Sequence, residues 1–228
     1  MKSGVIAALQ RARHSLKRQG IITSFRKVII VYLDLFFDVK YGTDTCTFSK
    51  LDQLTIESDN VERGIDYLPT RVIPLRKLFN IIESKTPPES VIIDFGCGKA
   101  RVLLMASQYN CFKAARGVEF AHELCVIAQS NFALFKQKSN VTADFEIIEG
   151  DVVDYHIRPD ENIFYMSNPF DGVVMGKIIN NITESLKVHP RKILIIYYYP
   201  IHGELIEMHF KKVEEFYFWG YQFNVYSN

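Results

Sequence analysis

The stretch at residues 91–101 limits what this chain can fold into more than any other part of the sequence. It opens with a short apolar run rich in β-branched residues, which predicts a buried strand. Gly96 and Gly98 follow, and a helix-forming pattern begins at Lys99. A strand, a glycine-rich turn and a helix in this order form a nucleotide-binding corner, because glycines let the backbone turn tightly and a helix start offers unpaired N–H groups to a ligand.

The residues around the two glycines discriminate between cofactors. The dinucleotide fingerprint needs a third glycine at the position that Arg101 occupies, which argues against a nicotinamide cofactor. Asp94, shortly before Gly96, would repel a pyrophosphate and attract a cationic ligand. Taken alone, the two glycines fit an ordinary tight turn at the end of a core strand equally well.

Five consecutive residues resemble the first motif of the class I S-adenosylmethionine-dependent methyltransferases: Asp94, Phe95, Gly96, Cys97 and Gly98. The resemblance implies that they bind S-adenosyl-L-methionine, whose sulfonium and ammonium groups suit a nearby carboxylate. The family's usual third glycine is Ala100 here, which still leaves room for the cofactor.

Further cofactor contacts are expected at the ends of the next two predicted strands, residues 114–120 and 145–151. Glu119 follows the glycine loop by about twenty residues, where an α/β nucleotide site places the acid that accepts hydrogen bonds from the ribose hydroxyls. The resemblance implies that Asp151 lies beside the adenine amine and that Phe120 and Val152 belong to the same pocket. A solvated strand end and a plain Gly-Asp turn are the alternatives.

The candidate catalytic residues follow a fourth predicted strand at residues 162–166: Ser167, Asn168, Pro169 and Phe170. This tip resembles the polar-Pro-Pro-aromatic loop of amino-group methyltransferases. There a polar side chain and a backbone carbonyl accept hydrogens from the substrate amine, and an aromatic ring packs on the group being methylated. The resemblance implies Ser167 or Asn168 as the polar group and Phe170 as the ring. With one proline in this loop, the substrate class stays open, and a plain Asn-Pro turn is the alternative.

The segments 41–45 and 67–70 look like those of a bacterial group of uncharacterised methyltransferases, which also share Lys99 and Arg101. The resemblance implies that Tyr67 and Thr70 fold over the methionine end of the cofactor. From the residues alone, 41–68 is a polar loop with little regular structure, followed by a helix.

The remaining periodicities complete an α/β prediction. Further strands are expected at residues 193–200, 213–219 and 221–226, the last two forming an antiparallel hairpin around Gly220. We therefore expect a Rossmann-like seven-stranded, mostly parallel sheet with an antiparallel C-terminal strand and helices on both faces. Residues 66–228 would form the methyltransferase domain, and residues 1–65 a basic helical extension and connecting loop.

The beginning of the chain is strongly basic, and no acidic residue precedes Asp34. Its cations are Lys2, Arg11, Arg13, Lys17, Arg18, Arg26 and Lys27. An amphipathic helix is expected up to Gly20, and residues 28–37 fit either a helix or a strand. We favour a helical pair that caps the domain; the alternative is contact of residues 1–27 with nucleic acid or an anionic membrane surface.

Composition sets the remaining bounds. A chain of 228 residues with 48% hydrophobic and 23% charged residues can build one full α/β core. The overall charge of +1 gives no reason to expect a nucleic-acid partner. The four cysteines show no metal-ligand spacing, so we expect reduced thiols and no metal. No apolar stretch is long enough to span a membrane and no signal pattern is present, which predicts a cytoplasmic protein with the N-terminal segment as a candidate peripheral membrane contact. The sequence leaves the oligomeric state open.

Methyl transfer by direct displacement, to an amine nitrogen of a small molecule or protein, is the function that the resemblance implies. A general base is needed only if the nucleophile arrives protonated. The sequence offers no clear candidate, because His156 and His202 fall in loop-like segments and are expected at the solvated surface. The alternatives are a nucleic-acid methyltransferase that uses the basic arm, and a non-catalytic protein that retains the fold.

Overall fold

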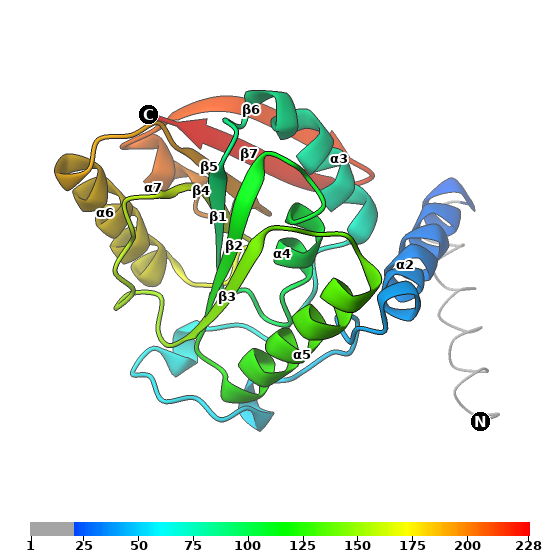
Figure 1. Cartoon of the computed structure of the whole chain (residues 1–228). Coiled ribbons are helices and arrows are strands. Elements are labelled where there is room, and N and C mark those ends of the chain that lie inside the picture. Colours follow the sequence, from blue (N-terminus) through cyan, green and yellow to red (C-terminus); the bar gives the residue numbers. More distant parts are fainter. Residues whose placement is uncertain (1–20) are drawn as a thin grey trace.

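A seven-stranded sheet with the order β3-β2-β1-β4-β5-β7-β6 forms the centre of the molecule (Figure 1). The computed structural model describes residues 21–228, so the basic helix expected before Gly20 lies outside the described residues. The strands are β1 (Ser90–Phe95), β2 (Phe112–Glu119), β3 (Asp144–Glu149), β4 (Glu161–Met166), β5 (Leu194–Tyr198), β6 (Lys211–Phe218) and β7 (Tyr221–Ser227). β1 to β5 run parallel, and β7 runs antiparallel to both β5 and β6. The predicted fold class is confirmed.

β1 lies at the middle of the sheet because both of its faces are apolar. All six of its residues are buried. Ile92 packs in the cluster on one face of the sheet and Ile93 in the cluster on the other. A strand covered on both faces needs a continuous apolar run rather than an alternating one, and residues 91–93 supply it.

Helices cover both faces of the sheet (Figure 1). The helices are α2 (Ile21–Tyr41), α3 (Val72–Ile82), α4 (Arg101–Ala106), α5 (His122–Lys138), α6 (Gly172–Val188) and α7 (Gly203–Glu207). Apolar residues of α2, α3, α4 and α5 pack on the face that Ile92 occupies, and those of α6 and α7 on the opposite face. The open alternative for residues 28–37 is settled as a helix, since Ile30, Phe37 and Tyr41 are buried at helical spacing.

The C-terminal hairpin turns at Trp219 and Gly220, and both residues have positive φ angles, of 53° and 87°. Two consecutive left-handed residues are typical of the tight turns whose twist matches that of paired strands. The predicted hairpin around Gly220 is therefore confirmed.

The loop between α2 and α3 runs along the edge of the sheet at which the glycine loop lies, and Figure 1 shows it in cyan below the strands. Its regular structure is limited to two 3₁₀ turns, Leu51–Gln53 and Val61–Arg63, and to isolated bridges. One bridge joins Ile56 to Ala121, and another joins Gly64 to Phe170. A third 3₁₀ turn, Glu83–Lys85, follows α3. Among the helices that the structure describes, none is long and apolar enough to cross a membrane.

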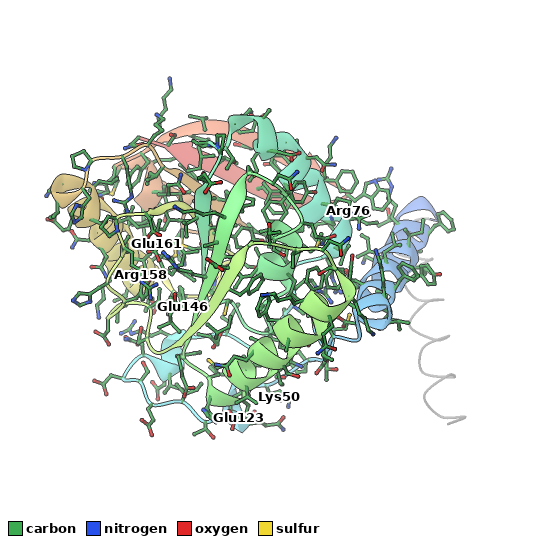
Figure 2. The ribbon with its side chains drawn as sticks, viewed as in Figure 1. Lys50, Arg76, Glu123, Glu146, Arg158 and Glu161 are labelled. Atoms are coloured by element: carbon green, nitrogen blue, oxygen red, sulfur yellow. The ribbon has the colours of Figure 1, made fainter. Side chains whose placement is uncertain are left out.

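An ion-pair network braces the flank of β2, β3 and β4 (Figure 2). The Glu161 side chain is fully buried and accepts hydrogen bonds from Arg116, from the Tyr155 hydroxyl and from the Arg158 backbone N–H. Arg158 in turn donates two hydrogen bonds, of 2.6 and 2.7 Å, to the Glu146 carboxylate. A buried carboxylate is tolerated here because three donors satisfy it.

Removing Glu161 should therefore destabilise the fold. We expect Glu161→Ala to lower the free energy of unfolding by about 2 to 3 kcal/mol, because Tyr155 and Arg116 lose a buried acceptor. Urea denaturation followed by circular dichroism measures the change. Glu184→Ala is the control, since Glu184 pairs with Lys187 while both side chains are more than half exposed, and it should stay within about 0.5 kcal/mol of wild type. Equal effects for the two variants would contradict the expectation.

Candidate functional site

A cavity of about 670 Å³, its open mouth included, lies where β1 and β4 end. Among the predicted site residues, those that line it are Tyr67, Thr70, Asp94, Gly96, Cys97, Gly98, Glu119, Phe120, Ser167, Pro169 and Phe170. A smaller hollow of about 300 Å³ shares Gly96, Phe120 and Phe170 with the cavity and adds Asp151 and Val152. The structure thus brings together all but one of the predicted cofactor residues and most of the predicted catalytic tip.

Two predicted site residues lie elsewhere. Phe95 points into the core, where its ring stacks on Phe164 at a centroid distance of 6.0 Å. The Asn168 side chain is held by Tyr197, whose hydroxyl donates to the Asn168 Oδ1 at 2.9 Å. Neither residue lines the cavity or the hollow. Ser167 is therefore the side chain of this polar pair that lines the cavity.

The glycine loop is built from left-handed backbone conformations. Gly96, Gly98 and Ala100 have φ angles of 76°, 53° and 68°. A Cβ atom on Gly98 would lie 2.2 Å from a ring carbon of Tyr67, so the space at this position excludes a side chain, and the left-handed backbone also favours glycine. The left-handed Ala100 explains why a third glycine is usual there. It also moves the start of α4 to Arg101, two residues beyond the expected start at Lys99.

The Asp94 carboxylate is the most unusual polar group of the site. It is 2% exposed, and its Oδ1 has no hydrogen-bond partner among the described residues. Burial, with a contribution from the nearby Glu119 carboxylate, raises the pKa of Asp94 well above its usual value. A buried acceptor without a donor costs about 1–3 kcal/mol, which a donor delivered into the cavity would recover.

Glu119 fixes the glycine loop to the end of β2. Its carboxylate accepts hydrogen bonds from the backbone N–H groups of Gly98, at 2.8 Å, and Ala121, at 3.0 Å. Burial raises the pKa of Glu119, and these N–H groups oppose the rise. A carboxylate has about four acceptor positions, so capacity remains for a ligand on the cavity side.

Asp151 ties the connecting loop to the smaller hollow. Its Oδ2 accepts hydrogen bonds from the Ser58 hydroxyl and from Asn60 Nδ2, and its Oδ1 accepts one from the Val153 N–H. Burial by itself raises the pKa of Asp151, but these hydrogen bonds outweigh it, and the pKa lies below its usual value. Asn60 also lines the hollow. Sequence reasoning missed Ser58 and Asn60, because their polar loop carries no motif and their partner lies some ninety residues further along.

The polar tip after β4 meets the connecting loop inside the cavity. Thr70 Oγ1 donates to Ser167 Oγ at 3.3 Å and lies 3.1 Å from the Tyr165 hydroxyl. Phe170 lines the cavity beside Ser167. The hydroxyls of Thr70 and Ser167 and the ring of Phe170 therefore line the cavity together, and the buried Tyr165 hydroxyl lies behind Thr70.

Tyr67, from the connecting loop, lines the cavity opposite the glycine loop. Its ring lies against Gly98, and its hydroxyl donates to the Thr45 carbonyl at 2.9 Å. The Lys99 ammonium lies 5.5 Å from the centre of the same ring. Shortly before Tyr67 in the same loop, Arg63 pairs with Asp171, the residue that caps α6. The connecting loop is thus fastened on both sides of the cavity.

Two cations just after the glycine loop are almost completely buried, and sequence reasoning gave them no structural role. Lys99 Nζ binds Asp44 at 3.0 Å and the Thr47 carbonyl at 2.9 Å. Arg101 donates to Thr45 Oγ1 at 2.7 Å and to the Thr70 carbonyl at 3.2 Å, and it pairs with Asp34 at 3.4 Å. Lysine and arginine side chains are rarely buried without such partners. The acids Asp34 and Asp44, earlier in the sequence, were the signal that could have predicted this pairing.

Other groups lie away from the cavity. His156 and His202 line neither the cavity nor the hollow. Within residues 21–228, no three His, Cys, Asp or Glu side chains are grouped so as to hold a metal ion. The four cysteines are free.

Known proteins were compared with this chain by sequence and by fold. No protein-family model matches the sequence. A curated protein-lysine N-methyltransferase from Saccharolobus islandicus (strain REY15A) is 27% identical over 123 residues, which are 54% of this chain and 66% of that protein. The matched region therefore spans just under two thirds of the relative's length.

Solved structures agree on the architecture. An RNA methyltransferase from Salinibacter ruber, in complex with S-adenosyl-L-homocysteine, matches with a TM-score of 0.52 at 14% identity, over 70% of this chain and 93% of that one. The N-methyltransferase NodS from Bradyrhizobium japonicum WM9, also in complex with S-adenosyl-L-homocysteine, matches with a TM-score of 0.53 at 9% identity, over 68% of this chain and 86% of that one. The chain has the fold of the S-adenosylmethionine-dependent methyltransferases, as the resemblance of its glycine loop predicts.

The raised pKa of Asp94 makes a prediction for the ligand-free protein. Because the folded state disfavours the ionised carboxylate, Asp94 should reduce stability as the pH rises above its unfolded pKa of about 4, and this penalty should be absent below that value. Asp94→Asn cannot ionise, so the variant should gain stability relative to wild type between about pH 4 and pH 8. Urea denaturation of both proteins across this range measures the difference. A stability difference independent of pH would contradict the prediction.

Proposed function

We propose that this chain is an S-adenosyl-L-methionine-dependent methyltransferase that acts on an amine nitrogen of a small molecule or protein. The observation that carries the proposal is the unpartnered, buried oxygen of Asp94 in a cavity formed by the glycine loop. An ammonium group is the donor that suits a buried carboxylate best. A pyrophosphate would instead be repelled by Asp94 and Glu119.

Each part of the cofactor would find a partner among the residues that line the cavity and the hollow. Asp94 would accept hydrogen bonds from the amino group of the methionine portion, and Glu119 from the ribose hydroxyls. The hollow at Asp151, Val152 and Phe120 would hold the adenine. When bound, the cofactor would supply an electrophilic methyl group on a sulfonium. The nucleophile would attack the methyl carbon in line with the C–S bond, which would break to release the neutral thioether S-adenosyl-L-homocysteine.

The protein's own contribution is positioning. Ser167 would accept a hydrogen bond from the incoming amine, while Phe170 packs on it. Tyr67 and the rest of the connecting loop would exclude water from above the glycine loop. Holding two reactants in the right geometry can lower a barrier by about 7–11 kcal/mol without acid or base catalysis.

An amine acceptor is supported by two observations. The tip after β4 resembles that of amino-group methyltransferases, and the curated relative at 27% identity is named a protein-lysine N-methyltransferase. A nucleic-acid acceptor is the second candidate, because the first part of the chain carries a dense set of cations. A non-catalytic protein with this fold is the third, and the binding and transfer measurements below discriminate among them.

Calorimetric titration with S-adenosyl-L-homocysteine tests the cofactor site. Wild type should bind with micromolar affinity and should not bind NAD. Asp94→Asn should weaken binding about 10- to 100-fold, because a charged hydrogen bond worth about 1.5–3 kcal/mol is lost. Glu119→Gln should weaken it by a similar factor. Glu184→Gln, on the exposed surface, is the control and should leave the affinity unchanged.

If the folded wild-type protein binds no S-adenosyl-L-homocysteine, the catalytic proposal is wrong and the non-catalytic alternative remains. Binding of NAD with comparable affinity would contradict the assignment of the cofactor.

Methyl transfer from labelled cofactor tests the acceptor. Supplied with a lysine-rich protein, a small polyamine and transfer RNA, the enzyme should label the protein or the amine. Phe170→Ala should lower kcat about 100-fold by loosening the placement of the amine. Val173→Ala, at an exposed position near the start of α6, should change kcat less than twofold. Label found only in RNA would support the nucleic-acid alternative instead.

A further inference from the structure

An apolar face of α2 points away from the core. The side chains on it are at least half exposed, and we call them the apolar stripe: Phe25, Val28, Tyr32, Leu35, Phe36 and Val39. Apart from the adjacent Leu35 and Phe36, successive positions are three or four residues apart, which places all six along one side of a helix. Ile30, Asp34 and Phe37 are buried on the other side. α2 is therefore apolar on two faces, of which the fold uses one.

The buried face fixes the orientation of α2. Phe37 stacks near Phe135 of α5 at a centroid distance of 6.0 Å, and Asp34 accepts a hydrogen bond from the Val72 N–H at the start of α3. Arg26 lies over the Trp219 ring of the C-terminal hairpin, 5.5 Å from its centre. With these contacts in place, the helix cannot rotate to bury the stripe. Figure 1 shows α2 at the edge of the molecule, across the sheet from α6.

The charged residues of the chain up to the middle of α2 are all basic. Residues 1–33 contain seven Lys or Arg and no Asp or Glu, whereas the rest of the chain contains 20 basic and 26 acidic residues. The two acids of α2, Asp34 and Asp38, are turned inward: Asp34 pairs with Arg71 and Arg101, and Asp38 accepts hydrogen bonds from Thr43 and Thr45. An acidic surface would therefore meet no opposing acid at this helix.

We propose that the apolar stripe, together with the basic residues of the first 27 positions, docks on an anionic lipid bilayer surface. Each feature alone fits other partners, but the combination selects a membrane. A nucleic-acid backbone satisfies the cations and leaves the stripe exposed to water. A second copy of the chain could cover the stripe but would bring two strongly basic segments together. An anionic bilayer satisfies both, because apolar side chains enter the headgroup boundary while cations bind the lipid phosphates.

The test is co-sedimentation of the full chain with vesicles. The protein should bind vesicles of phosphatidylcholine mixed with phosphatidylglycerol, should not bind phosphatidylcholine alone, and should bind less as salt is raised. The triple variant Val28→Ser, Tyr32→Ser, Val39→Ser should lower the partition coefficient at least about tenfold, because the inserted apolar area is lost. Replacing Arg11, Arg13, Lys17 and Arg18 by Gln should lower it by about fivefold for each cation removed at low salt.

A matched control has the same composition elsewhere on the surface. Val126, Val188 and Tyr217 are 50%, 71% and 65% exposed, against 64%, 63% and 77% for Val28, Tyr32 and Val39. Their triple serine variant should leave vesicle binding within about twofold of wild type. All six positions lie at the surface, so we expect each variant to fold, and circular dichroism checks that it does.

Three results would overturn the proposal. The folded wild-type protein could fail to bind the anionic vesicles, or the stripe variant could bind as well as the control variant. Sedimentation velocity could also show a wild-type dimer that the stripe variant abolishes, which would make the stripe an interface between copies. Vesicle binding needs no cofactor or methyl acceptor, so failure of the membrane proposal can be distinguished from failure of the proposed methyl transfer.

Discussion

The burial of the Arg101 guanidinium is the constraint on which the arrangement of the site depends. Its side chain is 1% exposed and reaches Asp34 of α2 and both ends of the connecting loop, at Thr45 and Thr70. An arginine removed from water costs several kcal/mol unless its donors are satisfied. α2 and the connecting loop must therefore both lie against the start of α4 for the Arg101 donors to be satisfied. Lys99 adds a second buried cation with the same requirement, bound to Asp44.

This constraint joins the N-terminal segment to the site. The predicted boundary near residue 65 rests on a change of composition and stays a prediction, but many contacts cross it, from Asp34, Thr45 and Asp151 among others. Asp34 binds both Arg71 and Arg101 and caps the start of α3 through the Val72 N–H. One residue of α2 thus sets the position of two helices at the cavity. The cover of the cavity is held by buried ion pairs rather than by regular secondary structure.

Sequence reasoning reached the sheet and the cavity because both depend on local patterns. The apolar run at residues 91–93, the left-handed glycines and the acid at the end of the second strand are each set by neighbours in the chain, and the parallel sheet then brings them to one edge. The roles of Ser58, Asn60, Lys99 and Arg101 depend on partners more than thirty residues away, so no local period reports them. Asn168 shows the same limit: its amide is held by Tyr197 of the neighbouring strand, which only the register of β4 and β5 determines.

The contact between Gly98 and Tyr67 has a consequence for how this chain can evolve. Ala100 already occupies a left-handed conformation two residues later, so the loop accepts the backbone cost of a side chain. What keeps position 98 a glycine is the ring of Tyr67, a few ångströms from where a Cβ would stand. The two positions are therefore coupled: a side chain at 98 is compatible with this loop only beside a smaller residue at 67. Among divergent descendants of this sequence, the two positions are expected to change together, and their covariation would report the contact without any structure.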